Sequence, residues 1–208
     1  MIILSNNLLG KDHFPIPAHV VIRVNVAWVK TMEELEHILQ ECTHDIYLDY
    51  PQGRSKPPRP TLNLEEVIQC AHRFPNVKYF AVSNVEDPHH IHAIKVRLPA
   101  RVDLIPKIET KKGIKNLEQI IEKIAAKYIM LDKEDLYVDI ARDAALFDEL
   151  IALARKKTER AGAQVLELEG VVFGIYTPTK KAAVPRRASA RMSRNKAMPR
   201  RAAAMRGS

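Results

Sequence analysis

The chain has 208 residues and is 46% hydrophobic, which is enough apolar side chain for a packed core and excludes wholesale disorder. Its formal net charge of +8 is uneven, because residues 179–208 hold ten Lys and Arg and no acid. Residues 1–178 therefore carry 23 bases against 25 acids, a net charge of −2, which excludes a basic nucleic-acid-binding body.

The start of the chain, MIILSNNLLGKD, lacks the basic region and the long apolar run of a secretory signal. No run of about 18 apolar residues predicts a membrane span. Cys42 and Cys70 are too few for a disulfide framework, and we expect them to be buried free thiols. These features predict a soluble, cytoplasmic protein with no membrane partner.

Six apolar, β-branched runs predict strands, and a helical pattern follows each of them. The strands are expected at residues 20–26, 46–48, 77–82, 102–108, 128–131 and 165–168. Helix starts are indicated by N-cap residues that precede a Glu or Gln, or a proline at the first helical position. These signals stand at Thr31, Asn63, Asp87 and Asn116, and a long helix over about residues 143–160 ends at Gly162.

Strict alternation of strands and helices predicts parallel strands joined by crossover helices. An open doubly wound sheet and a barrel both fit, but no glycine-rich phosphate loop follows any strand, and this favours the barrel. We therefore expect an α/β fold over residues 1–178, a parallel (β/α) TIM-type barrel that is incomplete at about six strands. Residues 179–208 are expected to be a disordered basic tail that binds nucleic acid or other polyanions non-specifically. Six strands leave open sheet edges, which makes self-association a further expectation.

Charged residues interrupt the apolar pattern at the carboxyl ends of two expected strands. Strand periodicity places Lys107 and Glu109 on one face, and Asp135 follows the next strand, one strand–helix–strand unit later. Barrel active sites form at these strand ends, so the two carboxylates are candidate ligands of Mg²⁺ or Mn²⁺. Lys107 would supply charge or a proton to a developing enolate. The pattern alone also fits surface ion pairs at the rim, Lys107–Glu109 and Lys133–Asp135.

Three other groups have candidate roles. Arg23 and Asn25 share one face of the first strand, either inside the site or on the solvated side of an edge strand. Asp49 ends the second strand and could join the same cluster. Residues 89–92, which read HHIH, are expected on a solvated helix face rather than at a metal site, because their ligand spacing is poor.

Residues 105–140, IPKIETKKGIKNLEQIIEKIAAKYIMLDKEDLYVDI, resemble the central segment of pyruvate kinase. In that family a K-I-E sequence, a glycine, an asparagine and a helix lead to an I-M-V-A-R-G-D-L-G strand end. The resemblance implies that Lys107 is the catalytic lysine, which acts as an acid or stabilises charge. It implies that Glu109 and Asp135 bind Mg²⁺. For the whole chain, it implies the glycolytic transfer of a phosphoryl group from phosphoenolpyruvate to ADP.

The resemblance extends upstream. Arg23 and Asn25 are similar to the family's A-R-L-N, which implies that Arg23 contacts phosphate and that Asn25 helps to hold K⁺. Asp49, followed by Gly53 and Arg54, is similar to its L-L-D-x-x-G-P-x-I-R and is expected to bind a cofactor. The implied ligands are phosphoenolpyruvate, pyruvate or a related keto acid, ADP or ATP, Mg²⁺ (or Mn²⁺) and K⁺.

The family pattern is interrupted at several positions, which leaves two alternatives open. The lid domain is reduced to residues 56–60, and Glu134, Tyr137 and Glu169 replace two glycines and a threonine. One alternative is a Mg²⁺-dependent 2-keto acid aldolase or citrate-lyase-β-like lyase. Those barrels also hold a pyruvate enolate with a Glu and an Asp at successive strand ends, although Lys107 is unusual there. The other is a non-catalytic barrel remnant with a polyanion-binding tail, which the three replacements favour.

Overall fold

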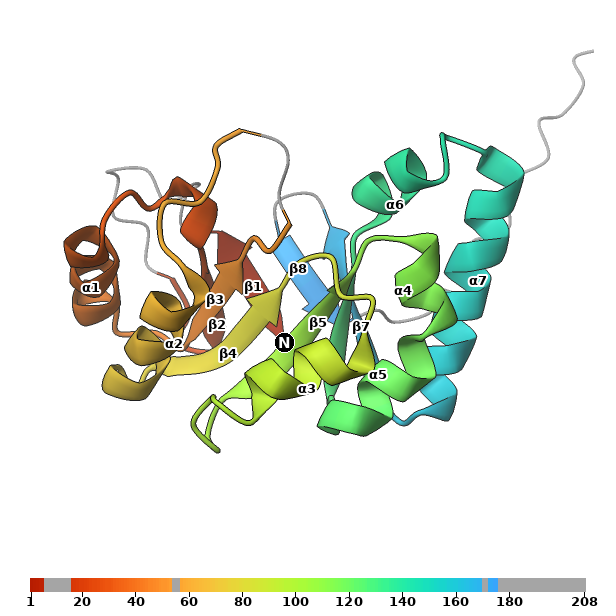
Figure 1. Ribbon diagram of the computed structural model, residues 1–208. Helices are drawn as coiled ribbons and strands as arrows, with labels where there is room; N and C mark the ends of the chain where they lie inside the picture. Colours follow the sequence, from red (N-terminus) through yellow and green to blue (C-terminus); the bar gives the residue numbers. More distant parts are fainter. Residues whose placement is uncertain (6–15, 54–56, 170–171, 176–208) are drawn as a thin grey trace, which may run out of the picture. The chain divides into compact units, whose positions relative to one another are not determined.

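Seven parallel strands and one antiparallel strand close into a barrel in the computed structural model, in the order in which they follow along the chain (Figure 1). The structure describes residues 1–5, 16–53, 57–169 and 172–175, which belong to the unit Met1–Tyr176. The parallel strands are β1 (Ile2–Ser5), β2 (Val20–Asn25), β3 (Ile46–Tyr50), β4 (Val77–Val82), β5 (Asp103–Ile108), β6 (Tyr128–Leu131) and β7 (Gln164–Glu169). The last strand, β8 (Val172–Ile175), pairs antiparallel with both β7 and β1. The predicted TIM-type α/β barrel is therefore confirmed, as a partial (β/α) barrel.

The expected number of six strands is too low, because the two missing strands give weak local signals. β1 and β8 are each four residues long, and both depend on pairing with strands beside them. β8 also follows β7 without an intervening helix, so the expected alternation does not predict it. Within the described residues both edges of the sheet are paired, which removes the open edges that suggested self-association. The expected basic tail, residues 179–208, lies outside the described residues.

Helices cover the outside of the strands (Figure 1). They are α1 (Met32–Glu41), α2 (Leu64–Arg73), α3 (Pro88–Lys95), α4 (Lys111–Lys115), α5 (Leu117–Ile124), α6 (Lys133–Asp139) and α7 (Ala144–Arg160), with a 3-10 turn, η2 (Val26–Trp28). The side chains of Thr31, Asn63 and Asp87 accept main-chain hydrogen bonds at the starts of α1 to α3, as expected. The helix expected at Asn116 starts earlier, where Thr110 caps α4, and is interrupted before α5. None of the described helices is long and apolar enough to cross a membrane.

The interior of the barrel is layered along the strands, as the alternation of side chains requires. One buried apolar layer takes a residue from each parallel strand: Ile3, Val21, Tyr47, Ala81, Ile105, Met130 and Leu166. Two positions further along five of these strands, on the same face, the chain has Arg23, Asp49, Ser83, Lys107 and Asp132. The apolar layer thus supports a polar layer that lies toward the carboxyl ends of the strands.

Candidate active site

A pocket of about 350 Å³ lies at the carboxyl ends of the parallel strands, where barrel enzymes place their active sites. Its charged lining consists of two bases and four acids: Arg23, Lys107, Glu109, Asp132, Asp135 and Asp139. The lining therefore has a formal charge of −2, which favours a bound cation.

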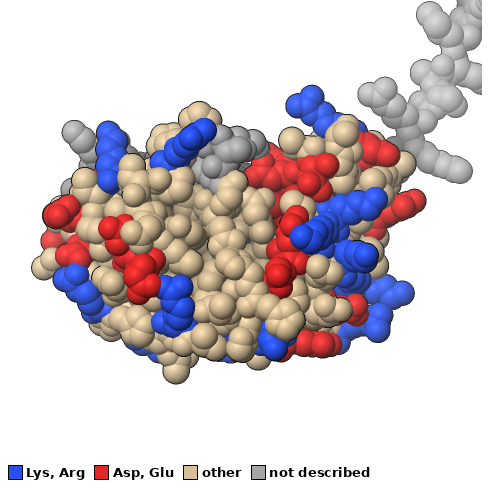
Figure 2. Space-filling model, viewed as in Figure 1, with Lys and Arg blue, Asp and Glu red and all other residues tan. Residues whose placement is uncertain are grey.

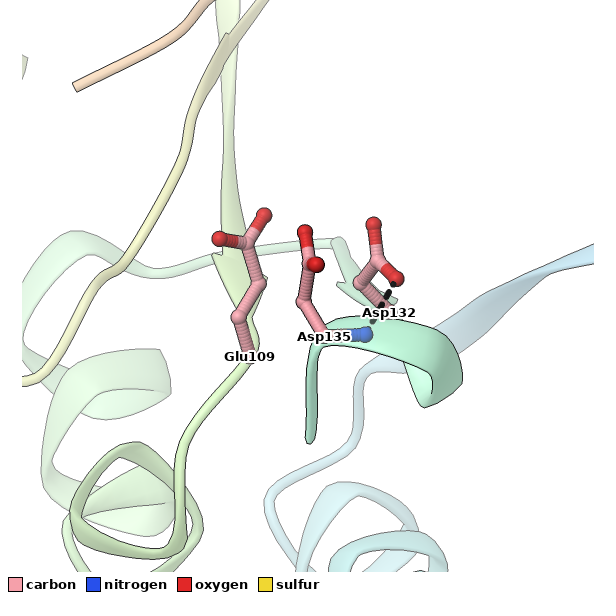
Figure 3. A group of neighbouring side chains, drawn as sticks. All are labelled: Glu109, Asp132 and Asp135. Atoms are coloured by element: carbon pink, nitrogen blue, oxygen red, sulfur yellow. Dashed lines mark hydrogen bonds between the residues drawn. The ribbon is translucent and has the colours of Figure 1, made fainter. Parts of the chain in front are cut away.

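Three of these acids form a cluster, which Figure 3 shows with their carboxylates side by side. One carboxylate oxygen from each of Glu109, Asp132 and Asp135 lies within 4.8 Å of the other two. Glu109 follows β5 directly, Asp132 follows β6, and Asp135 stands in the first turn of α6. A set of oxygen ligands with no nitrogen or sulfur suits a hard divalent cation such as Mg²⁺ or Mn²⁺.

The pairing of β5 with β6 brings Glu109 and Asp132 to the same level. Ile108 is the register partner of Leu131, so the residues that follow them end neighbouring strands side by side. Asp132 also donates its main-chain N–H to the Ile108 carbonyl at 3.1 Å, and its carboxylate accepts a hydrogen bond from the Asp135 N–H at 3.3 Å. Glu109 and Asp135 were expected from the sequence as metal ligands, but Asp132 was not. The sequence does contain a signal for Asp132, because this residue is the first polar one after an apolar strand and can cap a helix.

Lys107 lies beneath the acidic cluster, among buried polar groups. Its Nζ is 3.0 Å from Glu109 Oε1 and 3.6 Å from Asp49 Oδ1, and it donates a hydrogen bond to Ser83 Oγ at 3.0 Å. The Lys107 side chain is only 8% exposed, so the Lys107–Glu109 pair is not a surface ion pair at the rim. Ser83 is a second pocket residue that the sequence analysis did not assign.

Asp49 connects Lys107 to Arg23. Its Oδ2 accepts hydrogen bonds from two nitrogens of the Arg23 guanidinium, Nε at 2.9 Å and Nη2. β2 has β1 on one side and β3 on the other, so Arg23 belongs to an internal strand and not to a solvated edge. Arg23 reaches the pocket, whereas Asp49 is buried behind it and binds both bases.

Burial and the neighbouring charges shift the pKa values of Lys107 and Asp49 in opposite directions, and the neighbouring charges have the larger effect. Burial lowers the pKa of Lys107, but the charges of Asp49 and Glu109 more than offset it and raise that pKa above its usual value. Burial raises the pKa of Asp49, but Lys107 and Arg23 hold it below its usual value. Both groups are therefore charged at neutral pH. Each is held by its neighbours.

Glu109 has the opposite balance. Burial raises its pKa, Lys107 offsets only part of that rise, and the negative charges of Asp132 and Asp135 add to it. Its Oε2 accepts a hydrogen bond from the Asn84 main-chain N–H at 3.2 Å, whereas its buried Oε1 has an ion-pair contact but no directed hydrogen bond in the described part of the chain. A divalent cation would supply the missing partner, so the residues present fit such a metal.

The remaining candidates lie away from this cluster. Asn25 is buried and accepts a hydrogen bond from the Ala27 N–H at 3.1 Å, which caps η2. His89 and His90 are exposed at the start of α3, and His90 contacts the Gln52 side chain. Among the described residues, the group able to hold a metal is the acidic cluster, and it includes no histidine. Lys133 pairs with Glu167, which also binds Arg155 of α7.

Comparisons with known proteins give matches by structure. No family model and no curated protein matches the sequence. The citrate synthase SbnG has a TM-score of 0.56 at 14% identity, over 74% of this chain and 69% of that one. An HpcH/HpaI aldolase/citrate lyase family protein from Burkholderia cenocepacia has a TM-score of 0.57 at 10% identity, over 72% of this chain and 71% of that one. A citrate lyase from Burkholderia xenovorans has a TM-score of 0.56 at 7% identity, over 71% of this chain and 55% of that one. At these identities the matches show that the chain shares their fold.

The resemblance to pyruvate kinase is corrected by these matches. The similar structures are a citrate synthase, an aldolase/citrate lyase family protein and a citrate lyase, so assignment as a glycolytic kinase that transfers phosphoryl groups is wrong. The matching segment was short, and its carboxylates at successive strand ends are a feature that different barrels can share. In addition, the described chain between β3 and β4 holds α2 and its connections, with no lid domain to cover a nucleotide. The K⁺ assignment depended on the same resemblance and loses its support.

Proposed function

We propose that the chain is a divalent-metal-dependent lyase that breaks or forms a carbon–carbon bond next to a 2-keto acid such as pyruvate. The observation that carries this proposal is the acidic cluster of Glu109, Asp132 and Asp135, in one pocket with the two cations Lys107 and Arg23. An enolate is the common intermediate of such reactions, and its negative charge would develop among these groups. The names of the similar structures support the same class of chemistry.

Glu109, Asp132 and Asp135 would hold Mg²⁺ or Mn²⁺ in this proposal. When bound, the metal would supply a Lewis acid beside the keto acid's oxygens. The protein's own part is to fix three carboxylates at the ends of rigid strands and at a helix start, so that little reorganisation is needed on binding.

Lys107 and Arg23 are the proposed catalytic residues. Lys107 is charged, so it can stabilise the enolate oxygen or donate a proton to it, but it cannot take up a proton. The Arg23 guanidinium lines the pocket and suits a carboxylate, which it can bind through two parallel hydrogen bonds. Asp49 is proposed as a positioning residue, because it holds both cations from behind the pocket.

Hydrogen–deuterium exchange of the pyruvate methyl group tests this function. The exchange reports enolate formation without requiring the second substrate. The methyl C–H bond breaks, its proton passes to solvent water, and a deuteron from D₂O replaces it, which proton NMR follows. We expect exchange with Mg²⁺ or Mn²⁺, its loss in EDTA, and a fall of about 10²-fold or more in Lys107→Met, the scale of a lost acid–base group. Glu134→Gln is the matched control, because Glu134 is exposed on α6 outside the acidic cluster.

Two results would contradict the proposal. Exchange that survives EDTA would exclude metal dependence. If neither exchange nor Mn²⁺ binding is detected, the non-catalytic barrel would be the better description.

A further inference from the structure

We propose that a second pocket, next to the metal pocket, binds an aliphatic arm of the substrate that ends in a phosphate or carboxylate group. This inference rests on the proposed function and deepens it, because it defines the part of the substrate beyond the bond that breaks. The second pocket has a volume of about 570 Å³ and lies between α4 and α7.

The two pockets are contiguous. Thr110 and Asp139 line both of them, and the Asp139 carboxylate accepts a hydrogen bond from the Lys111 N–H at 2.8 Å in the wall between them. Thr110 directly follows Glu109, the proposed metal ligand on β5. A substrate held by its keto-acid end in the first pocket could therefore extend over this wall into the second.

The floor of the second pocket is apolar. Ile114 of α4 and Leu150 of α7 are buried, and Leu153 of α7 is 41% exposed although it is a large hydrophobic residue. An exposed leucine next to two buried aliphatic side chains offers area that an aliphatic chain can cover. The floor thus favours methylene groups over a polar ligand.

The rim of the second pocket is basic. Four lysines and two acids line it, which gives a formal charge of +2, opposite in sign to that of the metal pocket. On the face shown in Figure 2, basic side chains gather over α4 and lie beside acidic ones. The pair of pockets would therefore accept a cation in the first and an anion in the second.

Two of the four lysines are already engaged, and two are available. Lys112 pairs with Glu86 at 3.0 Å, and Lys157 donates to the Ile114 and Lys115 carbonyls at 3.0 and 2.6 Å. Within the described residues, the side chains of Lys111 and Lys115 have no acidic partner. Both are exposed at the pocket, where an ammonium group can pair with phosphate or carboxylate.

Binding of hexyl phosphate to the whole protein, measured by calorimetry, tests the second pocket directly. We expect hexyl phosphate to bind at least tenfold more tightly than inorganic phosphate, the scale for about two buried methylene groups. It should also bind more tightly than hexanol, which lacks the charge. Heptanoate replaces the phosphate by a carboxylate and shows which anion the rim prefers.

Variants locate the binding site. Replacing both Lys111 and Lys115 by Gln should weaken hexyl phosphate binding by about three- to tenfold, the scale of two exposed ion pairs. The control Lys156→Gln removes an exposed lysine of α7 that does not line the pocket, and it should change little. Equal weakening in the control, or equal affinities for hexyl phosphate and inorganic phosphate, would overturn the proposal.

The second-pocket proposal and the proposed function can fail separately. Hexyl phosphate should bind Glu109→Gln as it binds the wild type, because Glu109 does not line the second pocket. Normal binding in a protein without pyruvate exchange would refute the lyase function alone. Normal exchange without hexyl phosphate binding would refute the second pocket alone.

Discussion

Asp49 determines the charge state of the site although its carboxylate lies behind the pocket. It is 2% exposed, and it binds Arg23 and Lys107 together. Two cations so close to each other would repel in a low-dielectric interior, and the carboxylate between them removes most of that cost. The pocket thus presents two positive groups at fixed positions without a bound anion.

We predict that Asp49→Asn lowers the free energy of unfolding by about 3–5 kcal/mol at neutral pH, because it removes the buried carboxylate that pairs with both Arg23 and Lys107. The folded-state pKa of Asp49 is below its usual 3.8, so its contribution is complete above that value and is lost as the pH falls through the lower, folded-state pKa. Urea unfolding of both proteins at pH 7 and at steps below about pH 3.8 measures this. The difference should shrink toward acid, whereas Asp148→Asn, an exposed change on α7, should have little effect at any pH.

We expect the Glu109 carboxylate to lower the stability of the metal-free protein and to bind the metal. Its folded-state pKa is above 4.5, so the carboxylate costs stability once the pH rises through the window above that value. We predict that Glu109→Gln unfolds at a higher temperature than the wild type in EDTA at pH 7. With Mn²⁺ at about 100 times its Kd the wild type should gain about 2.7 kcal/mol and the variant much less. An equal gain from Mn²⁺ in both proteins would show that Glu109 is not a ligand.

The start of α4, like that of α6, is held next to the site. Thr110, next to Glu109, caps α4 by accepting a hydrogen bond from the Gly113 N–H at 3.0 Å, and its own hydroxyl donates to Glu86. A Cβ added at Gly113 would lie 2.7 Å from the Val85 carbonyl oxygen, closer than side chains approach in proteins. Glycine at this position therefore lets α4 pack against the chain that follows β4.

Replacing that glycine should disturb both the fold and the metal site. We predict that Gly113→Ala lowers the free energy of unfolding by about 1–3 kcal/mol, the usual cost of overpacking. Mn²⁺ affinity should also fall, because the shift of α4 moves Thr110 and the adjoining Glu109. Chemical denaturation and Mn²⁺ titration measure the two effects. Lys112→Ala, an exposed change in the same helix, should stay within about 1 kcal/mol of the wild type.

Features that depend on residues close together in the sequence could be predicted, and features that depend on closure of the barrel could not. The caps at Thr31 and Asn63 were predicted because each requires only residues within one helical turn. Lys107 and Glu109 share a face because strand periodicity is local. The contact of Asp49 with Lys107 crosses from β3 to β5 through the barrel interior, so it follows from curvature of the sheet and has no local signal.

At the scale of the whole molecule, the fold depends on a strand that runs against the others. β8 pairs with both β7 and β1, so it covers both edges of the seven-stranded parallel sheet. An uncovered parallel edge would present free main-chain groups to another copy of the chain. The antiparallel strand therefore protects the barrel from edge-to-edge association.

Two truncations test this role. A chain that ends at residue 176 keeps β8, and we predict that it stays folded in the same oligomeric state as the full chain. A chain that ends at residue 169 lacks β8, and it should form larger species or lose stability, because β1 and β7 become free edges. Analytical ultracentrifugation and thermal denaturation compare the two. Identical behaviour would show that β8 is dispensable.

The chemical part of the chain is continuous. The residues described as lining the metal pocket fall between Arg23 and Asp139. A single stretch of gene therefore encodes these residues. Recombination with one junction on each side could move that stretch between barrels. In protein design, the same stretch could be transferred as one segment, and the strands β1, β7 and β8 that close the barrel could be redesigned around it.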